Sequence, residues 1–342
     1  MDSLTQAALG ATIGELVLGR RIAGKAALYG AVVATIPDLD VFVPMGGPVA
    51  DFVYHRSWSH SLLVLTAISP LVAEGIRRWR GDPESWRIRW LTLVFLALFT
   101  HPLLDAFTIY GTQLLWPLSD YPFGIGSVFI IDPAFTLPLL IGLLLAMTLL
   151  RHSPHRTRAA AIGLAVGCTY LGWTVFAQHR AAAIVATADN HPYGGAGLSL
   201  TIPSPFNSLL WRSIIMAPNG RSYAIGYDSF LDGRRTPTFE TYRTRADLLE
   251  ALAGHWPADR LRAFTKGFNG VSEVSGRVSL RDLRMGVEGR YVFAFEIARM
   301  ANGAPVPLPA MRIPPTRDLS GLGRVFERIL DPNVKLAPPS QR

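Results

Sequence analysis

The first half of the chain alternates long apolar stretches with short polar segments. The apolar stretches cover residues 26–43, 61–76, 90–109, 129–150 and 159–178. A bilayer core of about 30 Å is crossed by about 20 helical residues, and the last stretch has this length without a single charged side chain. Residues 3–18 are also apolar but shorter, and we expect them to form a helix that packs against the others. The pattern therefore predicts about five membrane spans preceded by an N-terminal apolar helix.

The pattern changes in the second half. Runs rich in aromatic and β-branched side chains, typical of strands, cover residues 197–216, 221–230 and 291–300. Residues 244–255 have a helical period with Thr244 as the expected N-cap, and the proline-rich residues 302–316 are expected to form a connector. We predict a mainly α membrane protein whose transmembrane helical domain covers 1–179, followed by an extracytoplasmic α+β domain over 180–342.

The composition favours a membrane protein over a soluble one. Hydrophobic residues make up 49% of the chain and charged residues only 17%, and the mean hydropathy is +0.26. The net charge is +8, but the basic excess is spread thinly over the C-terminal half and forms no continuous run. A groove that follows a nucleic-acid backbone is therefore not predicted.

The basic residues also predict an orientation in the membrane. They concentrate in segments 19–25, 77–89 and 151–158. The intervening segments are poor in them, since 44–58 contains only Arg56 and 110–128 contains none. Because positively charged loops stay in the cytoplasm, we expect 44–58, 110–128 and the C-terminal domain to lie on the extracytoplasmic side of the cell inner membrane.

Three short motifs hold most of the ionisable residues of the span region. They are PDLD with Asp38 and Asp40, HRSWSH with His55 and His60, and THPLLD with His101 and Asp105. His101 and Asp105 are four residues apart, so a helix places them on one face. With a rise of about 1.5 Å per residue, Asp38, His101 and Asp105 lie about 18, 17 and 23 Å from the cytoplasmic ends of their spans. The motifs therefore reach a common level near the outer membrane face.

This set of side chains is suited to a metal ion. Mixed imidazole and carboxylate ligands favour Zn²⁺, with Mn²⁺ or Fe²⁺ as alternatives. Such an ion lowers the pKa of bound water, and a spare aspartate can act as general base. Arg56 is a candidate for binding an anionic substrate group, or else for pairing with Asp51 or a lipid headgroup. Ser59 and Ser61 are expected to cap the following helix.

The same motifs carry a family resemblance. MDSLTQAALGA, PDLDVF, HRSWSHS, THPLLDAFTIYGTQLLWPLSDYPF and IIDPAFTLPLL together resemble the bacterial inner-membrane family described as membrane-bound, metal-dependent hydrolases and also as LexA-regulated. The resemblance implies a multi-span bundle, a divalent metal and hydrolytic chemistry. The metal-linked positions that it implies are Asp38, His55, His60, His101 and Asp105, with Asp40 as a further candidate. Many members have His directly after the N-terminal Thr; here that position is Gln6, a poor zinc ligand, which is expected to orient a ligand or water together with Thr5.

We therefore expect an integral membrane hydrolase that uses zinc-activated water, with Asp105, Asp40 and Arg56 as catalytic residues. A weaker similarity to helical zinc phospholipases and nucleases favours a phosphoester, including a lipid. The expected partners are membrane lipids and a small-molecule or lipid substrate, and no nucleic acid is expected. Two alternatives remain open: a transporter or ion-binding protein that uses the buried Asp/His cluster, and a non-catalytic scaffold that binds a partner through its outer domain.

Overall fold

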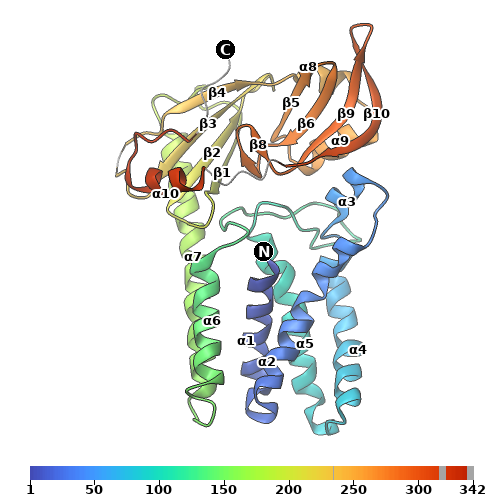
Figure 1. Ribbon diagram of the computed structural model, residues 1–342, viewed down its shortest axis with the longest axis vertical. Coiled ribbons are helices and arrows are strands. Elements are labelled where there is room, and N and C mark those ends of the chain that lie inside the picture. The colour runs from blue at the N-terminus through green and yellow to red at the C-terminus, as the bar shows by residue number, and fades with distance from the viewer. Residues whose placement is uncertain (234, 316–320, 337–342) are drawn as a thin grey trace. The chain divides into compact units, whose positions relative to one another are not determined.

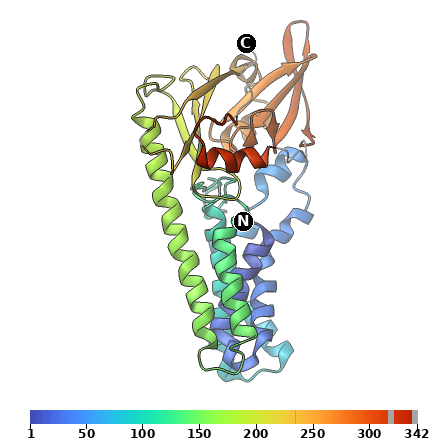
Figure 2. The same cartoon turned by 60° about the vertical axis from the view of Figure 1, so that its left-hand side comes forward.

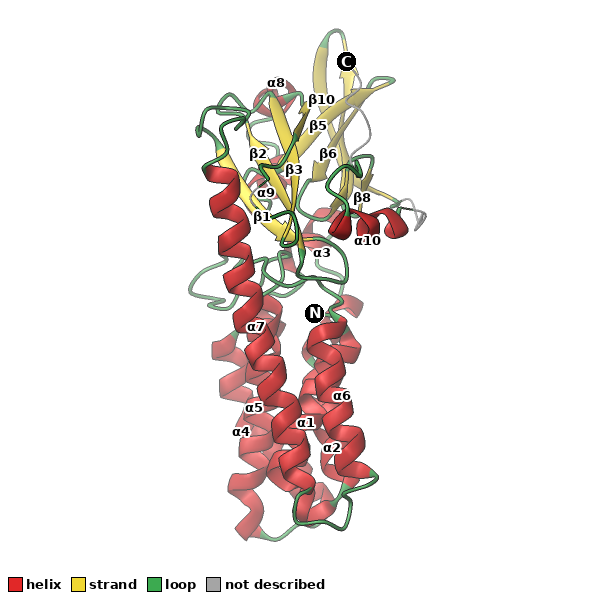
Figure 3. Cartoon of the chain, turned by 90° about the vertical axis from the view of Figure 1, so that its left-hand side faces the viewer, coloured by secondary structure: helices red, strands yellow, loops and turns green. Residues whose placement is uncertain are grey.

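The computed structural model describes residues 1–233, 235–315 and 321–336 (Figure 1). The chain divides into two compact units. The first, called here the helical unit, comprises Met1–Val43 and Arg56–Thr174, and the second, the sheet unit, comprises Pro44–His55 and Val175–Arg342. Helices dominate the first unit and strands the second (Figure 3), so the expected helical N-terminal half and C-terminal sheet-containing domain are confirmed. The predicted boundary between 179 and 180 falls within the helix that links the two units.

The helical unit is built from apolar helices joined by short turns. Its elements are α1 (Ser3–Ile22), α2 (Gly24–Thr35), η1 (Pro37–Phe42), η2 (Trp58–His60), α4 (Leu62–Arg80), η3 (Glu84–Trp86), α5 (Arg87–Ala106), α6 (Pro133–Met147) and the first part of α7 (Arg156–Ala186). Side chains from α1, α2, α4 and α5 form a core around Trp90, Leu93 and Leu98, which are fully buried. Ser61 caps α4 as predicted, since its hydroxyl accepts a hydrogen bond from the Val64 amide at 3.3 Å.

Glycines allow the helices of this unit to approach closely. A Cβ on Gly10 of α1 or on Gly30 of α2 would collide with the backbone of the other helix. The same holds for Gly142 of α6 and Gly163 of α7, two helices that run side by side in Figure 2. Small residues at such contacts let helices pack tightly where no hydrophobic effect drives their association. The α1–α2 contact is the one that matters for the site, because η1 continues directly from α2.

Two described helices are long and apolar enough to cross a membrane, Glu84–Ala106 and Arg156–Ala186. A third candidate arises if the helices on either side of Ser61 form one broken span. The predicted stretch 26–43 contains a helix only as far as Thr35, because Pro37 begins a 3₁₀ turn, and α6 is a shorter apolar helix. The structure therefore supports two or three candidate spans by length and composition, and the count of five stays a prediction.

The sheet unit contains two four-stranded antiparallel sheets and one two-stranded sheet. The strand order is β1-β2-β3-β4 in the first, β10-β9-β6-β5 in the second and β7-β8 in the third. The strands are β1 (Leu198–Pro203), β2 (Leu210–Met216), β3 (Ser222–Ser229), β4 (Phe239–Arg243), β5 (Asn269–Val274), β6 (Arg277–Asp282), β7 (Gly286–Val287), β8 (Arg290–Tyr291), β9 (Ala294–Ala301) and β10 (Ala304–Ile313). The helices are α3 (Pro48–Tyr54), α8 (Ala246–Ala251), α9 (Trp256–Phe264) and α10 (Leu322–Leu330).

The short helix α3 belongs to this unit although it lies early in the chain. Its Phe52 ring contacts the rings of Phe264, Phe293 and Phe295, with centroid distances of 4.9, 4.5 and 5.4 Å. Burial of the Phe52 ring against these three rings explains why segment 44–55 packs with the sheet unit and not with the helical unit.

Two sequence predictions for this half are wrong in detail. Thr244 does not cap a helix; α8 starts at Ala246, and the Thr244 hydroxyl accepts a hydrogen bond from the Val271 amide at 2.7 Å. The proline-rich stretch 302–316, whose last residue lies outside the described part of the chain, contains the strand β10 rather than a connector. This strand lies at an edge of its sheet, where prolines are tolerated because a missing amide hydrogen breaks no ladder on the open side.

Candidate metal centre

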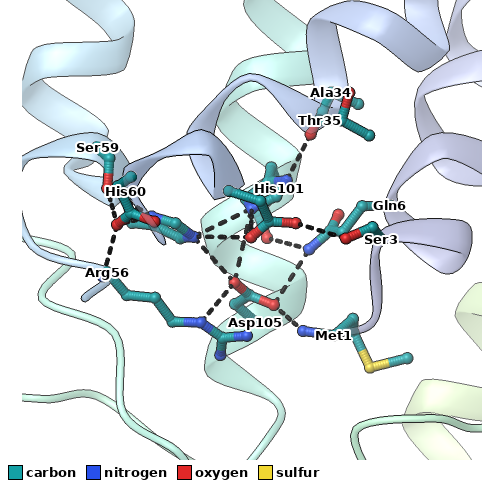
Figure 4. A network of polar contacts seen from close by, with 12 residues as sticks. Met1, Ser3, Gln6, Ala34, Thr35, Arg56, Ser59, His60, His101 and Asp105 are labelled. Atoms are coloured by element: carbon teal, nitrogen blue, oxygen red, sulfur yellow. Dashed lines mark hydrogen bonds and ion pairs between the residues drawn. The ribbon is translucent and has the colours of Figure 1, made fainter. Parts of the chain in front are cut away.

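Three elements of the helical unit bring four ionisable side chains together (Figure 4). Asp38 comes from η1, His60 from η2, and His101 and Asp105 from successive turns of α5. Figure 4 labels His60, His101 and Asp105. Each of the four offers one ligand atom, and these atoms all lie within 4.8 Å of one another. The structure therefore brings together four of the five residues that the sequence predicts as ligands.

The distances between the ligand atoms have the size expected around a single ion. His60 Nε2 lies 3.1 Å from His101 Nε2, 3.2 Å from Asp105 Oδ2 and 3.6 Å from Asp38 Oδ1. His101 Nε2 lies 3.4 Å from Asp38 Oδ1 and 3.6 Å from Asp105 Oδ2. A tetrahedral zinc ion with bonds of about 2.0–2.1 Å separates its ligand atoms by about 3.3 Å. Five distances thus agree with a tetrahedral or similar arrangement.

The backbone fixes the tautomer of His101. Its Nδ1 lies 2.6 Å from the carbonyl oxygen of Ala34, the next-to-last residue of α2. A carbonyl oxygen can only accept a hydrogen bond, so Nδ1 carries the hydrogen in the neutral ring. The lone pair of Nε2 is then directed at the cluster.

A relay of side chains fixes the tautomer of His60 in the same way. Ser59 Oγ donates to Asp40 Oδ2 at 2.6 Å, so its own hydrogen is not available to the ring. The Ser59 oxygen lies 2.9 Å from His60 Nδ1 and therefore accepts from it. In the neutral ring, the lone pair of His60 Nε2, like that of His101 Nε2, is directed at the cluster.

In these neutral tautomers, the lone pairs of both Nε2 atoms and of the two carboxylates face one another. Two imidazole nitrogens at 3.1 Å repel each other unless a metal ion lies between them or one ring carries a second proton, which a carboxylate then accepts. His60, His101 and Asp105 are fully buried, so solvent cannot screen this repulsion. The donor set of two imidazoles and two carboxylates fits Zn²⁺, Mn²⁺ or Fe²⁺.

Asp105 is oriented by groups on both of its oxygens. Gln6 Nε2 donates to Oδ1 at 3.2 Å and to the carbonyl oxygen of His101 at 3.1 Å, and the Met1 α-amino group also contacts Oδ1. The other oxygen, Oδ2, is buried and faces the two imidazoles and the Arg56 guanidinium. Gln6 thus orients a candidate ligand from the position where many members of the resembled family have His. Thr5 bonds instead to Asp2 and Thr136.

Arg56 pairs with Asp105 rather than lying free to meet a substrate. Its Nε is 3.2 Å from Asp105 Oδ2, and its guanidinium lies over the Tyr110 ring at 5.0 Å. The side chain is buried, and the residue adopts a φ of 67°, in the left-handed region that arginine rarely occupies. The backbone amide of Arg56 donates to Asp40 Oδ2 at 3.0 Å, which helps to hold this conformation. A direct role toward substrate stays a prediction.

Two further predicted site residues are, like Arg56, outside the four-residue group. His55 is the C-cap of α3 and belongs to the sheet unit, so the structure does not place it beside the other four. Asp40 lies behind Ser59 and acts on His60 through that hydroxyl. Sequence reasoning assigned Ser59 to a helix cap and missed this role. Its position directly before His60 was the available signal.

The relay predicts an effect on metal affinity. Replacing Ser59 with alanine removes the acceptor that holds His60 Nδ1–H, so the ring can rotate or change tautomer. Groups that orient a ligand typically contribute 10–100-fold to affinity, and a loss of roughly that size is expected. Zinc affinity measured by competition with a chromogenic chelator checks it. Ser3→Ala is the matched control, since the exposed Ser3 hydroxyl is 3.5 Å from Asp38 Oδ2; equal losses in both variants would contradict the relay.

Comparison with known proteins supplies a family for the helical half. No curated protein and no solved structure matches the chain. Residues 1–181, which are more than half of the chain and include all four clustered side chains, match the family model described as YdjM inner membrane protein. The chain therefore belongs to the YdjM inner membrane protein family.

Proposed function

We propose that this chain is an integral membrane, metal-dependent hydrolase. The observation that carries the proposal is the convergence of four ligand atoms, in which both imidazoles use Nδ1 for hydrogen bonds away from the common centre. Asp38, His60, His101 and Asp105 would hold the ion. A divalent cation in such a site polarises a substrate oxygen and lowers the pKa of water toward about 7.

Asp38 marks the open side of the cluster. Its side chain is 19% exposed, whereas those of His60, His101 and Asp105 are fully buried. Water and substrate would therefore approach from the side of η1. Arg56, Gln6 and the α2 carbonyl of Ala34 hold the buried side rigid, which keeps the ligands in position before substrate binds.

The same geometry favours Asp38 as the residue that accepts a proton from water. Asp38 Oδ1 faces the imidazoles, while Oδ2 is contacted by the Ser3 hydroxyl at the long distance of 3.5 Å. Asp105 is a weaker candidate, because Arg56 and the Met1 α-amino group both stabilise its charged form. Asp40 is committed to Ser59 and to the Arg56 amide, which supports a positioning role.

The surroundings of Asp38 support a phosphoester in a lipid as the substrate. Leu39, Val41 and Phe42 follow it in the chain and are exposed, Phe42 to 80%. Apolar side chains beside the open face of the cluster favour a substrate with acyl chains. The arginine distribution supports an extracytoplasmic site, with the sheet unit on the same side of the inner membrane.

The test is metal-dependent hydrolysis by the purified full-length protein. A chelator should abolish cleavage of a chromogenic phosphoester or of fluorescent phospholipid in mixed micelles, and Zn²⁺, Mn²⁺ or Fe²⁺ should restore it. His60→Ala should be inactive under the same conditions, whereas His55→Ala should remain active. If the protein binds metal tightly but hydrolyses neither substrate, and proteoliposomes take up the ion, an ion-binding or transport role replaces this proposal.

A further inference from the structure

A second polar site lies at the arginine-rich end of the helical unit. A cavity of about 370 Å³ opens there, lined by Leu16, Val17, Arg20 and Arg21 of α1, Arg89 of α5 and Thr157 of α7. Arg89 and His101 are twelve residues apart on α5, so the cavity is about 18 Å along that helix from the candidate metal centre. The two sites are therefore separate.

The three arginines of the cavity lack carboxylate partners within the described residues. One Nη of Arg20 donates to the Pro154 carbonyl and to the Thr157 hydroxyl, both at 3.2 Å, which holds its guanidinium at the cavity wall. Arg21 lies over the Trp86 ring at 5.7 Å. No ion pair joins Arg20, Arg21 or Arg89 to any acidic side chain in the part of the chain that the structure describes.

Other arginines at the same end are neutralised. Arg156, next to Thr157, forms a two-pronged pair with Glu15. Glu74 forms ion pairs with Arg77 and Arg78, and Asp82 forms one with Arg80. Glu15, Glu74 and Asp82 are thus bound to arginines outside the cavity, and no described carboxylate forms an ion pair with the three cavity arginines.

Three guanidinium groups around one space are suited to a phosphate group. Arginine binds phosphate through paired, charge-assisted hydrogen bonds. Basic pockets between membrane helices are known to bind anionic lipid headgroups. The apolar residues Leu16 and Val17 extend the lining along α1, and Trp86 is of a type that is enriched at membrane interfaces. A free phosphate would make no use of the apolar side of the lining, whereas a lipid would.

We propose that this cavity binds the headgroup of an anionic phospholipid, with its phosphate held by Arg20, Arg21 and Arg89 and the start of an acyl chain along Leu16 and Val17. The site does not depend on the proposed hydrolase activity. It gives the helical unit a lipid-specific anchor at the end away from the Asp/His cluster.

The test compares two triple variants with equal changes in charge. In the first, Arg20, Arg21 and Arg89 are replaced by glutamine. In the second, the exposed residues Lys25, Arg151 and Arg158, which do not line the cavity, are replaced by glutamine. The purified full-length proteins are titrated in detergent with phosphatidylglycerol and with zwitterionic phosphatidylcholine, and native mass spectrometry counts the lipids retained.

The natural sequence should retain one phosphatidylglycerol in preference to phosphatidylcholine. The cavity variant should bind it roughly 100-fold more weakly, because each arginine near an anionic lipid contributes roughly a factor of five. The control variant should bind it normally. The single variant Arg89→Gln, with an expected loss of about fivefold, replaces the triple variant if thermal melting shows that the latter is unfolded.

Three results would overturn the proposal. Equal losses in the two triple variants would show general attraction of basic residues to anionic lipid. An absence of preference for phosphatidylglycerol would show that the phosphate is not recognised. Displacement of the lipid by millimolar inorganic phosphate, with phosphate binding lost in the cavity variant, would assign the cavity to a soluble phosphate instead.

Discussion

Purified His101→Ala protein should contain at least tenfold less zinc, manganese and iron than the natural sequence. The imidazole of His101 offers one of four candidate ligand atoms, and the contact of its Nδ1 with the Ala34 carbonyl at 2.6 Å directs Nε2 at the cluster. Loss of a ligand is expected to exceed the 10–100-fold effect of losing a group that only orients one. Elemental analysis of the protein after dialysis against the metal measures the change.

His55→Ala is the matched control for this experiment. His55 is the same residue type, five positions before His60, and the sequence motifs favour it equally, but it is outside the four-residue group. Its replacement should leave the metal content unchanged. If both variants lose metal, His55 completes the ligand set and the four-residue cluster is incomplete; if neither does, the Asp/His group does not bind metal.

Glu15→Ala should destabilise the helical unit more than any substitution outside its apolar core. Glu15 of α1 is fully buried, and both of its carboxylate oxygens pair with Arg156 of α7, with Arg156 Nη2 at 2.6 Å from Oε2. Removing one partner leaves a guanidinium buried and uncompensated. Such a change lowers the free energy of unfolding by about 3–5 kcal/mol. Thermal or denaturant unfolding in detergent, followed by circular dichroism, measures it.

A double variant separates the cost of the unpaired charge from the loss of packing. Glu15→Leu combined with Arg156→Met removes both charges, so the free energy of unfolding should return close to that of the natural sequence. Glu74→Ala, which breaks the pairs with Arg77 and Arg78, should have a smaller effect, because the Glu74 side chain is 21% exposed and solvent screens its pairs. A double variant as unstable as Glu15→Ala would mean that shape, and not charge, makes this contact important.

The local sequence was sufficient to locate most of the described helices but only four of the ten described strands, β1, β2, β3 and β9. The apolar stretches around α5 and α7 and the β-branched runs of β2, β3 and β9 carry their periodicity within ten to twenty residues, which is the range over which backbone structure is decided. The sequence failed where position in a sheet overrides composition. Pro305 and Pro307 would disrupt an inner strand, but β10 is an edge strand, and nothing in residues 302–316 alone reveals an edge.

Part of the candidate site could also be read from the chain. The four-residue spacing of His101 and Asp105 fixes them on one helix face, and their placement in an apolar span marks them as functional candidates. Asp38 lies in the four-residue group, and the family resemblance ranked it above Asp40, but the residue spacing offered no physical reason for that order. The 3₁₀ turn η1 directs Asp38 toward the imidazoles and Asp40 toward Ser59. The geometry of this turn depends on how α2 ends.

Local sequence establishes which residue types are available and which of them share a helix face, because both depend on neighbours along the chain. Packing between distant segments brings His60 to His101, turns Arg56 toward Asp105 and makes the two imidazoles present their Nε2 atoms to each other. These outcomes depend on the Ala34 carbonyl, the Ser59 hydroxyl and the approach of α1 to α2. Every residue has a carbonyl, so its role as a hydrogen-bond acceptor leaves no mark in the sequence until packing selects the partner.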